Sequence, residues 1–322
     1  MAARYLTNHT MQSLSDTCIH NWYRFVLAYP DHLVSDMIGH FNIRPGQMVL
    51  DPFVGTGTTL VECKKRGIRA AGIDLNPVTA FASRVKTTWD VDLGEFEKRR
   101  VEFLSRLRSV LRATIPSAPT QLSFSDLRAG ELQADGPLYD EPLVDGDAIK
   151  ALLPKGAISD IPLRKILIAR QIVDEFPQDA ATDLLRLALV SVAVSDASNL
   201  GFGPEVYVKR QQRADVDVYT ALANKLLKMA DDLAVVQQVP EPGATTVHTG
   251  DARELARLVQ GPVDFVITSP PYPNEKDYTR TTRLELVLLG YVQDRNDLRQ
   301  LKETMLRSHT RNIFADDDDS VY

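Results

Sequence analysis

Short apolar runs that stop at a polar residue recur along the chain and predict four strands. They cover residues 47–51, 69–74, 245–251 and 263–268. The first three end at Asp51, Asp74 and Asp251, and helix-compatible segments follow them. Apolar runs of this length that alternate with helices are typical of a sheet of parallel strands. The pattern therefore predicts an α/β fold.

A second pattern fills residues 89–242. Apolar residues recur there at helical spacing in four stretches, at residues 95–113, 162–176, 182–194 and 217–236. The Pro- and Gly-rich segment between residues 116 and 154 instead predicts surface loops. We therefore predict a mostly helical insertion at 89–242, within an α/β domain formed by residues 1–88 and 243–322.

The loop after the first strand is the most informative stretch of the sequence. It runs Asp51-Pro-Phe-Val-Gly55-Thr-Gly57-Thr-Thr59 and leads into a helix. The two glycines allow the backbone to approach a ligand where a Cβ would collide. A phosphate-gripping loop would place a Lys before the Ser/Thr pair, and a dinucleotide loop would place a third glycine where Leu60 stands. A loop that begins with an acid and carries no cation suits a ligand that is itself cationic.

The last predicted strand leads into Thr268-Ser269-Pro270-Pro271-Tyr272. The paired prolines fix φ, so Ser269 and the Pro270 carbonyl can be held as hydrogen-bond acceptors, and Tyr272 offers a flat ring for stacking. Acceptors that engage both hydrogens of an aromatic amine free its lone pair for in-line attack on a methyl donor. A base in a duplex would first have to be flipped out. The simpler alternative is a proline turn after a buried strand.

Both motifs resemble those of the amino-methylating DNA methyltransferases. The Asp-Pro-Phe-x-Gly-x-Gly-Thr-Thr run is similar to the cofactor loop of that family, and Ser-Pro-Pro-Tyr is similar to its catalytic motif. The resemblance implies a Rossmann-like methyltransferase sheet with S-adenosylmethionine as cofactor and DNA as partner. It also implies the catalytic residues Ser269, Pro270, Pro271 and Tyr272.

The resemblance further implies a set of cofactor-binding residues. Asp74 lies about 20 residues beyond the loop, where a carboxylate can accept two hydrogen bonds from a ribose diol; the alternative is an exposed turn acid. Asp251 would bind the adenine amine, cap the next helix, or do both. In the family an aromatic segment closes over the methionine end of the cofactor, and Trp22, Tyr23 and Pro30 resemble it; alternatively, the helix predicted after Pro30 packs on the sheet edge. The predicted cofactor-binding residues are Asp51, Pro52, Phe53, Gly55, Gly57, Thr58, Thr59, Asp74, Asp251, Ala252 and Tyr23.

The sequence leaves several alternatives for the target of methylation. Ser269 stands where adenine enzymes of the family usually carry Asp or Asn, which favours cytosine N4 over adenine N6. The chain has no Pro-Cys dipeptide, in agreement with methylation of an amine and not of a ring carbon. RNA as substrate remains an alternative, as does a non-catalytic relative that binds DNA or a partner.

The net charge of −6 requires that any DNA contact come from local basic clusters. Lys209, Arg210 and Arg213 follow glycines and aromatics in a predicted loop, and Arg280 and Arg283 lie close to the catalytic motif. Cations of this kind suit contact with a phosphate backbone. A solvated basic loop and a solvated helix start are the alternatives.

Cysteine content and the absence of long apolar runs indicate an intracellular protein. Cys18 and Cys63 have neither a disulfide framework nor metal-ligand spacing, so we expect no metal and a reducing compartment. No signal-peptide core and no run long enough to cross a bilayer are found. We expect a cytoplasmic location and no membrane partner.

Four strands are fewer than the resembled family requires. Its complete sheet has seven strands in the order 3-2-1-4-5-7-6, and nothing after Tyr272 reads as the last three. The fourth strand would then be an exposed apolar edge, which isolated proteins avoid. We predict that another polypeptide, either a second subunit or another copy of this chain, completes the sheet. A chain that is itself a fragment is the alternative.

Overall fold

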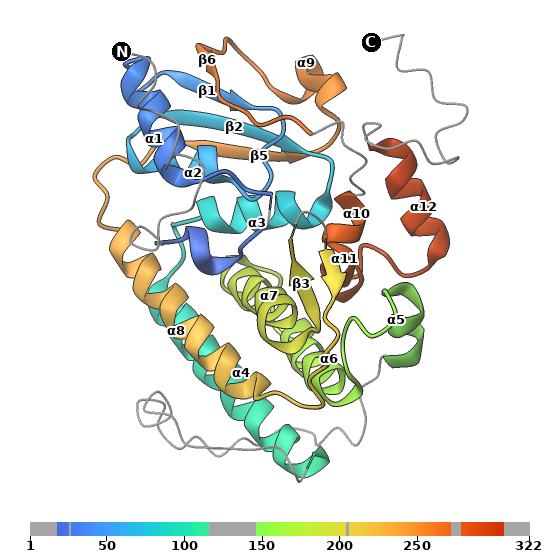
Figure 1. The fold of residues 1–322 in the computed structure, drawn as a ribbon. Helices are drawn as coiled ribbons and strands as arrows, with labels where there is room; N and C mark the ends of the chain where they lie inside the picture. The colour runs from blue at the N-terminus through green and yellow to red at the C-terminus, as the bar shows by residue number, and fades with distance from the viewer. Residues whose placement is uncertain (1–17, 26, 116–145, 204–205, 272–277, 306–322) are drawn as a thin grey trace. The chain divides into compact units, whose positions relative to one another are not determined.

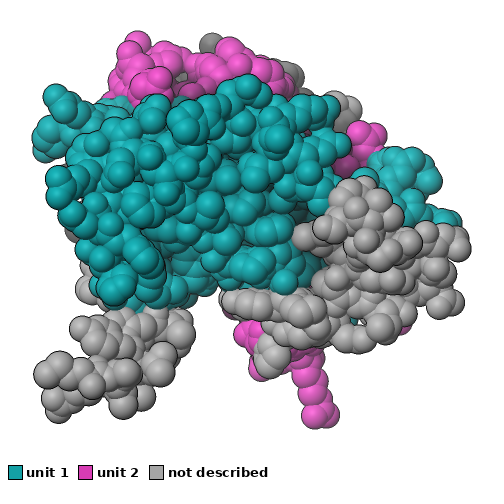
Figure 2. Space-filling model, turned by 90° about the horizontal axis from the view of Figure 1, so that it is seen from above, with its two compact units in different colours: residues 1–89, 235–281, 295–322 teal, residues 90–234, 282–294 magenta. Residues whose placement is uncertain are grey.

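The computed structural model describes residues 18–25, 27–115, 146–203, 206–271 and 278–305. The chain forms two compact units, which are coloured separately in Figure 2. Unit 1 comprises residues 1–89, 235–281 and 295–322, and unit 2 comprises residues 90–234 and 282–294. Among the described residues, none of the helices combines the length and apolar character needed to cross a lipid bilayer.

Unit 1 is built on a sheet of four parallel strands. The strands are β1 (Met48–Asp51), β2 (Arg69–Asp74), β5 (Thr245–Thr249) and β6 (Phe265–Val266). Their spatial order is β5-β2-β1-β6 (Figure 1). The predicted α/β, Rossmann-like fold is confirmed, and this order corresponds to the 3-2-1-4 part of the expected sheet. β5 and β6 are shorter than the apolar runs that predicted them.

Helices in unit 1 connect the strands as the alternation of patterns predicts. The crossover from β1 to β2 is α2 (Thr58–Lys65), and α3 (Pro77–Thr87) follows β2 and packs on β5 and β2. Ahead of the sheet, α1 (Asp31–His40) begins at the predicted Pro-Asp start. The remaining elements are η1 (His20–Trp22), η3 (Ala252–Glu254), α9 (Leu255–Leu258), α10 (Tyr278–Thr281) and α12 (Arg295–Thr304).

The core of unit 1 joins α1, β1 and α2. Buried apolar side chains from these elements pack together, among them Val34, Ile38, Val49, Leu60 and Cys63. α1 packs directly on α2, and in the segment before α1 the Tyr29 hydroxyl donates to Asp51 at the carboxyl end of β1. This placement matters for the site, since the segment before α1 contributes to it.

Unit 2 is mostly helical, as predicted. The helices α4 (Leu93–Thr114), α6 (Asp160–Asp174) and α7 (Ala180–Val192) pack against one another. α7 continues into the π-helical turn η2 (Ala193–Ala197), which contacts α11 (Arg283–Leu288). α8 is Val218–Val236. The four long helices correspond to the four stretches with helical spacing.

Two elements of unit 2 differ from the predictions. α5 (Gly146–Leu152) lies where only loops were predicted, at the end of the Pro- and Gly-rich text. The predicted basic loop begins as an antiparallel pair, β3 (Leu200–Phe202) with β4 (Val206–Val208). Gly201 makes this pairing possible: it faces Tyr207, and a Cβ on Gly201 would lie 2.5 Å from a ring carbon of Tyr207. The Tyr207 ring packs over Gly201 in the paired strand. This packing could not be predicted from the glycine-rich sequence, which is also typical of a loop.

Candidate functional site

A cavity in unit 1 lies at the carboxyl ends of the strands. Its lining comes from residues 25 and 27–29, 52–56 and 58, 74–76 and 79, 250–252 and 269–271, with Tyr278 and Met305. The loops after β1, β2 and β5 therefore meet the segment after β6 and the segment before α1 at one place. The carboxyl edge of a parallel sheet is the usual place for a ligand in open α/β folds.

Most of the predicted catalytic and cofactor-binding residues reach this cavity. Those that line it are Pro52, Phe53, Gly55, Thr58, Asp74, Asp251, Ala252, Ser269, Pro270 and Pro271. Four other predicted residues, Asp51, Gly57, Thr59 and Tyr23, do not line it. Tyr272 lies outside the described residues. The cofactor loop and the catalytic motif, which are far apart in the sequence, thus face the same cavity.

Both glycines of the loop have left-handed backbone angles. Gly55 has φ of 51° and open space where a Cβ would stand, and it lines the cavity. Gly57 has φ of 86° and caps α2, and a Cβ there would lie 2.6 Å from the Ser83 hydroxyl of α3. Left-handed angles favour glycine. Gly55 leaves room on the ligand side, and Gly57 allows the loop to pack against α3.

Asp74 is the acid at the end of β2, and its carboxylate is held by backbone donors. The N–H groups of Gly55 and Asn76 each donate to it at 2.8 Å. Despite these hydrogen bonds, burial raises the pKa of Asp74 to about 6. The carboxylate lines the cavity and is placed to accept hydrogen bonds from a ligand there.

Asp251 carries an ion pair that the sequence did not predict. The Arg253 guanidinium donates to both carboxylate oxygens, with Nε–Oδ1 at 3.1 Å and Nη2–Oδ2 at 2.7 Å. Its backbone N–H also donates to Oδ1, at 2.8 Å. Asp251 is also the cap of η3. Against the raising effect of partial burial, Arg253 holds the pKa of Asp251 below its ordinary value. The carboxylate is therefore ionised at the edge of the cavity.

Asp51 is fully buried and is not part of the cavity lining. Its carboxylate accepts hydrogen bonds from the Phe53 N–H at 3.1 Å and from the hydroxyls of Tyr29 at 2.8 Å, Thr59 at 2.8 Å and Thr268 at 2.7 Å. Burial raises the pKa of Asp51, although each of these donors lowers it. Sequence reasoning singled out neither Tyr29 nor Thr268 for this role.

The segment before α1 contributes different aromatics from those predicted. Tyr23 is buried, and its backbone carbonyl accepts a hydrogen bond from the buried Lys86 ammonium at 2.7 Å. Trp22 and Pro30 do not line the cavity either, whereas Phe25 and Tyr29 do. The segment does lie against the cavity, and α1 packs on α2; closure of the segment over the cofactor stays a prediction. The signal for Tyr29 is its position directly before the Pro-Asp helix start.

The predicted DNA-contacting cations lie in both units. In unit 2, Arg210 and Arg213 are exposed after β4, and Arg213 donates to the Asp196 carbonyl at 2.5 Å. Arg283 begins α11 and donates to the Leu152 carbonyl at 3.5 Å. Arg280 is exposed on α10 in unit 1. Lys209 is half-buried, and its backbone N–H bonds the Asn199 carbonyl. DNA contact by these residues stays a prediction.

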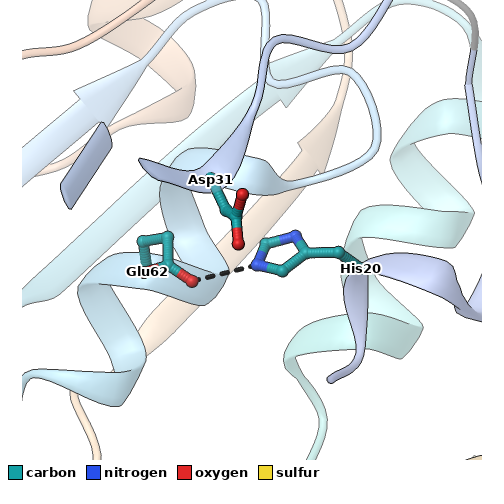
Figure 3. A group of neighbouring side chains, drawn as sticks. All are labelled: His20, Asp31 and Glu62. Atoms are coloured by element: carbon teal, nitrogen blue, oxygen red, sulfur yellow. Dashed lines mark hydrogen bonds and ion pairs between the residues drawn. The ribbon is translucent and has the colours of Figure 1, made fainter. Parts of the chain in front are cut away.

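One further polar cluster lies in unit 1, at the junction of η1, α1 and α2. Figure 3 shows His20, Asp31 and Glu62, whose ligand atoms lie within 4.8 Å of one another. The Glu62 carboxylate accepts hydrogen bonds from His20 at 2.9 Å, Lys65 at 2.8 Å and Arg66 at 2.6 Å. Two cations that already bind this carboxylate oppose the binding of a metal ion. We interpret the cluster as an anchor between η1 and α2.

The strand order and the acid-and-glycine loop at the carboxyl edge define a Rossmann-like methyltransferase architecture. Residues 8–81 match the N6/N4-type family model described as DNA methylase. The chain is 27% identical over 309 residues to "Type II methyltransferase M.BsoBI" of Geobacillus stearothermophilus, which covers 94% of this chain and 58% of that protein. The predicted resemblance is confirmed: the chain is related to the amino-methylating N4/N6 DNA methyltransferases.

Other relatives match over long or short stretches. "Type II methyltransferase M.AvaI" of Anabaena variabilis is 25% identical over 313 residues, which cover 91% of this chain and 58% of that protein. "Type II methyltransferase M.MjaII" of Methanocaldococcus jannaschii is 36% identical over 69 residues, or 21% of this chain and 12% of that protein. This chain thus spans 58% of the length of M.BsoBI and M.AvaI. No solved structure matches the chain significantly.

Proposed function

We propose that this chain acts in a site-specific DNA methyltransferase that transfers a methyl group from S-adenosylmethionine to the exocyclic amine of a flipped base, most favourably cytosine N4. One observation carries the proposal: Ser269 and the two following prolines line the same cavity as the glycine loop, Asp74 and Asp251. A donor and an acceptor that react in one step must be held side by side. The relatives named above are type II methyltransferases, which supports the same activity here.

The charge of the cavity supports S-adenosylmethionine as the cofactor. Among the described residues, the lining holds the carboxylates of Asp74 and Asp251 and no Lys or Arg side chain. This composition disfavours a phosphate-bearing ligand and suits one with sulfonium and ammonium groups. Asp74 would hold the ribose hydroxyls and Asp251 the adenine amine, while Phe53 offers an apolar surface. When bound, this cofactor supplies an electrophilic methyl group.

The segment after β6 would hold the target amine. The Ser269 hydroxyl and the Pro270 carbonyl can accept the two amine hydrogens, which draws the nitrogen toward tetrahedral geometry and frees its lone pair. This arrangement needs no covalent enzyme intermediate. Ser269 in place of Asp or Asn supports cytosine N4 over adenine N6. Tyr272 would stack on the flipped base, and Lys209, Arg210, Arg213, Arg280 and Arg283 would contact the phosphate backbone.

We further propose that another polypeptide completes the sheet along β6. Within the described part of the chain, β6 is the end strand, and no strand follows it. A groove runs between α1 and β6, with Leu33, Met37 and Ile267 in its lining. Phe41 and Val266 in the same groove are 54% and 57% exposed. An apolar edge of this kind supports pairing with a further strand.

The proposed activity is tested by transfer of tritiated methyl groups to DNA, followed by identification of the methylated nucleoside. The chain is assayed alone and together with the product of the neighbouring gene, with Ser269→Ala as the control. We expect N4-methylcytosine and no product from the variant. N6-methyladenine would change the target but not the class of enzyme, and methylation of RNA alone would change the substrate. Gel filtration of the same samples tests the partner, because an active monomer would contradict it.

A non-catalytic relative that binds DNA or a partner is the second candidate. Calorimetry with S-adenosylmethionine separates the two, since an inert scaffold with a closed or altered cavity gives no heat. The open cavity and its two carboxylates favour the enzyme.

A further inference from the structure

Asp51 begins the cofactor loop, yet it is not among the residues that line the cavity. It lies at the end of β1, between β2 and β6, and is completely buried. A buried carboxylate is tolerated only when its oxygens are hydrogen-bonded. The four donors on Asp51 are all groups of this chain: the Phe53 N–H and the hydroxyls of Tyr29, Thr59 and Thr268. Its acceptor positions are therefore filled without any ligand.

The three hydroxyl donors come from three separate segments. Tyr29 belongs to the segment before α1 and itself lines the cavity, Thr59 lies in the first turn of α2, and Thr268 directly precedes Ser269. The Tyr29 and Thr59 hydroxyls also contact each other. One carboxylate thus joins three segments that form walls of the cavity.

Thr268 extends the pairing of β1 with β6 toward the catalytic motif. The Ile267 N–H donates to the Leu50 carbonyl at 3.0 Å, and the next residue bonds Asp51 through its side chain at 2.7 Å. Ser269 follows at once and lines the cavity. This side-chain bond is therefore a direct link between the loop that begins at Asp51 and Ser269.

We propose that Asp51 is a positioning residue that couples the cofactor loop to Ser269 through Thr268, and is not a ligand of the cationic groups of the cofactor. This inference rests on the proposed function. Binding of the cofactor in the loop orders the segment that receives the target amine, so donor and acceptor halves of the site are assembled together. A direct hydrogen bond from Asp51 to the cofactor would require its carboxylate to line the cavity.

The test is hydrogen–deuterium exchange of the full chain with and without S-adenosylmethionine. In the wild type, bound cofactor slows exchange in peptides covering 52–59 and 262–269. In Thr268→Val we expect a dissociation constant within about two-fold of the wild type, unchanged protection of 52–59, and loss of the protection of 262–269. Thr268→Ser, which keeps the hydroxyl, restores it. Thr268 is exposed, and Asp51 keeps its three other donors in this variant, so valine there is compatible with folding.

Thr88→Val is the matched control, because the Thr88 hydroxyl bonds the Arg84 carbonyl on the surface of α3, away from the cavity lining. Its exchange should equal that of the wild type. Tyr29→Phe removes a different donor and should leave the protection of 262–269 intact. Coupling that persists in Thr268→Val overturns the inference, as does a loss of cofactor affinity of about ten-fold or more. A wild-type chain that binds no cofactor instead refutes the proposed function.

Discussion

The backbone N–H of Gly55 donates a hydrogen bond of 2.8 Å to the carboxylate of Asp74. The acid after β2 therefore shapes the glycine loop after β1, and the same carboxylate lines the cavity. Asn76 N–H binds the other oxygen at 2.8 Å. The Thr79 hydroxyl is a third donor to this carboxylate, and a carboxylate oxygen can accept more than one hydrogen bond, so a ligand can still bind here. Loop geometry and the proposed binding of the cofactor are thus linked through one side chain.

Cofactor affinity should depend on pH through Asp74. Burial raises the pKa of Asp74 to about 6, and the ionised form accepts hydrogen bonds from ribose hydroxyls better than the protonated form. The dissociation constant should be constant above that pKa and rise by up to about ten-fold per pH unit below it. Calorimetry between about pH 5 and pH 8 measures it.

Asp74→Asn is the matching variant for this prediction. An amide oxygen accepts fewer hydrogen bonds than a carboxylate, so affinity should fall by about ten-fold at neutral pH, and the dependence near pH 6 should disappear. The same slope in wild type and variant would assign the dependence to another group.

Gly57→Ala should destabilise the protein more than Gly46→Ala. Both glycines have φ of 86°, so both alanines carry a similar backbone strain of roughly 1 kcal/mol. A Cβ on Gly57 would lie 2.6 Å from the Ser83 hydroxyl and 3.1 Å from the Ser83 Cα, whereas nothing lies within 4 Å of one on Gly46. Urea denaturation should therefore show an excess loss of about 1–3 kcal/mol for Gly57→Ala.

Gly46→Ala is the control that separates the cost of backbone strain from the cost of the contact between a Cβ on residue 57 and Ser83. Equal losses in the two variants would mean that α3 moves aside without cost. Cofactor binding should also fall in Gly57→Ala and remain unchanged in Gly46→Ala, because only Gly57 shapes the loop beside the cavity.

The sequence predicted the parallel sheet because each strand is a short apolar run that stops at a polar residue, and this signal is local. The meeting of Ser269 with the glycine loop could also be predicted, since carboxyl ends of parallel strands share one edge of the sheet. The burial of Asp51 could not, because it depends on hydroxyls of Tyr29 and Thr268 that are distant in sequence. The pairing of Gly201 with Tyr207 could not be predicted for the same reason. It depends on a contact between two strands, which neither residue indicates by itself.

Arg253 should weaken cofactor binding in the wild type. Its guanidinium binds both oxygens of Asp251 and also donates to the Thr304 carbonyl at 3.3 Å. An adenine amine that binds Asp251 must share or displace those hydrogen bonds. A partly exposed ion pair is worth up to about 1 kcal/mol, so Arg253→Gln should tighten the dissociation constant by up to about five-fold.

Calorimetry of Arg253→Gln and Asp251→Asn checks this prediction. Asp251→Asn should weaken binding, and the double variant should resemble it, because Arg253 then has no carboxylate to compete for. Weaker binding by Arg253→Gln alone would show that the arginine orients Asp251 for the ligand.

Glu62 should contribute more to stability than any exposed ion pair of unit 1. Its side chain is 2% exposed and accepts hydrogen bonds from His20, Ser35, Lys65 and Arg66. Glu62→Gln keeps the shape but removes the charge that balances the two cations, so we expect a loss of about 2–4 kcal/mol. Glu254→Gln is the control: Glu254 pairs with Arg257 on the surface and should cost less than about 1 kcal/mol.

The contribution of Glu62 should also depend on pH in a defined direction. Against the raising effect of burial, the hydrogen bond from His20 and the charge of Lys65 hold the pKa of Glu62 well below its ordinary value of 4.5. When the pKa of a carboxyl group is lower in the folded protein than in the unfolded chain, its ionisation stabilises the folded state. This stabilisation is complete at pH values above the pKa in the unfolded chain. The stabilisation is lost as the pH falls toward the folded pKa. The difference in free energy of unfolding between wild type and Glu62→Gln should therefore be constant at neutral pH and shrink below about pH 4.5. A difference that grows on acidification would mean that His20, and not the carboxylate, carries the titration.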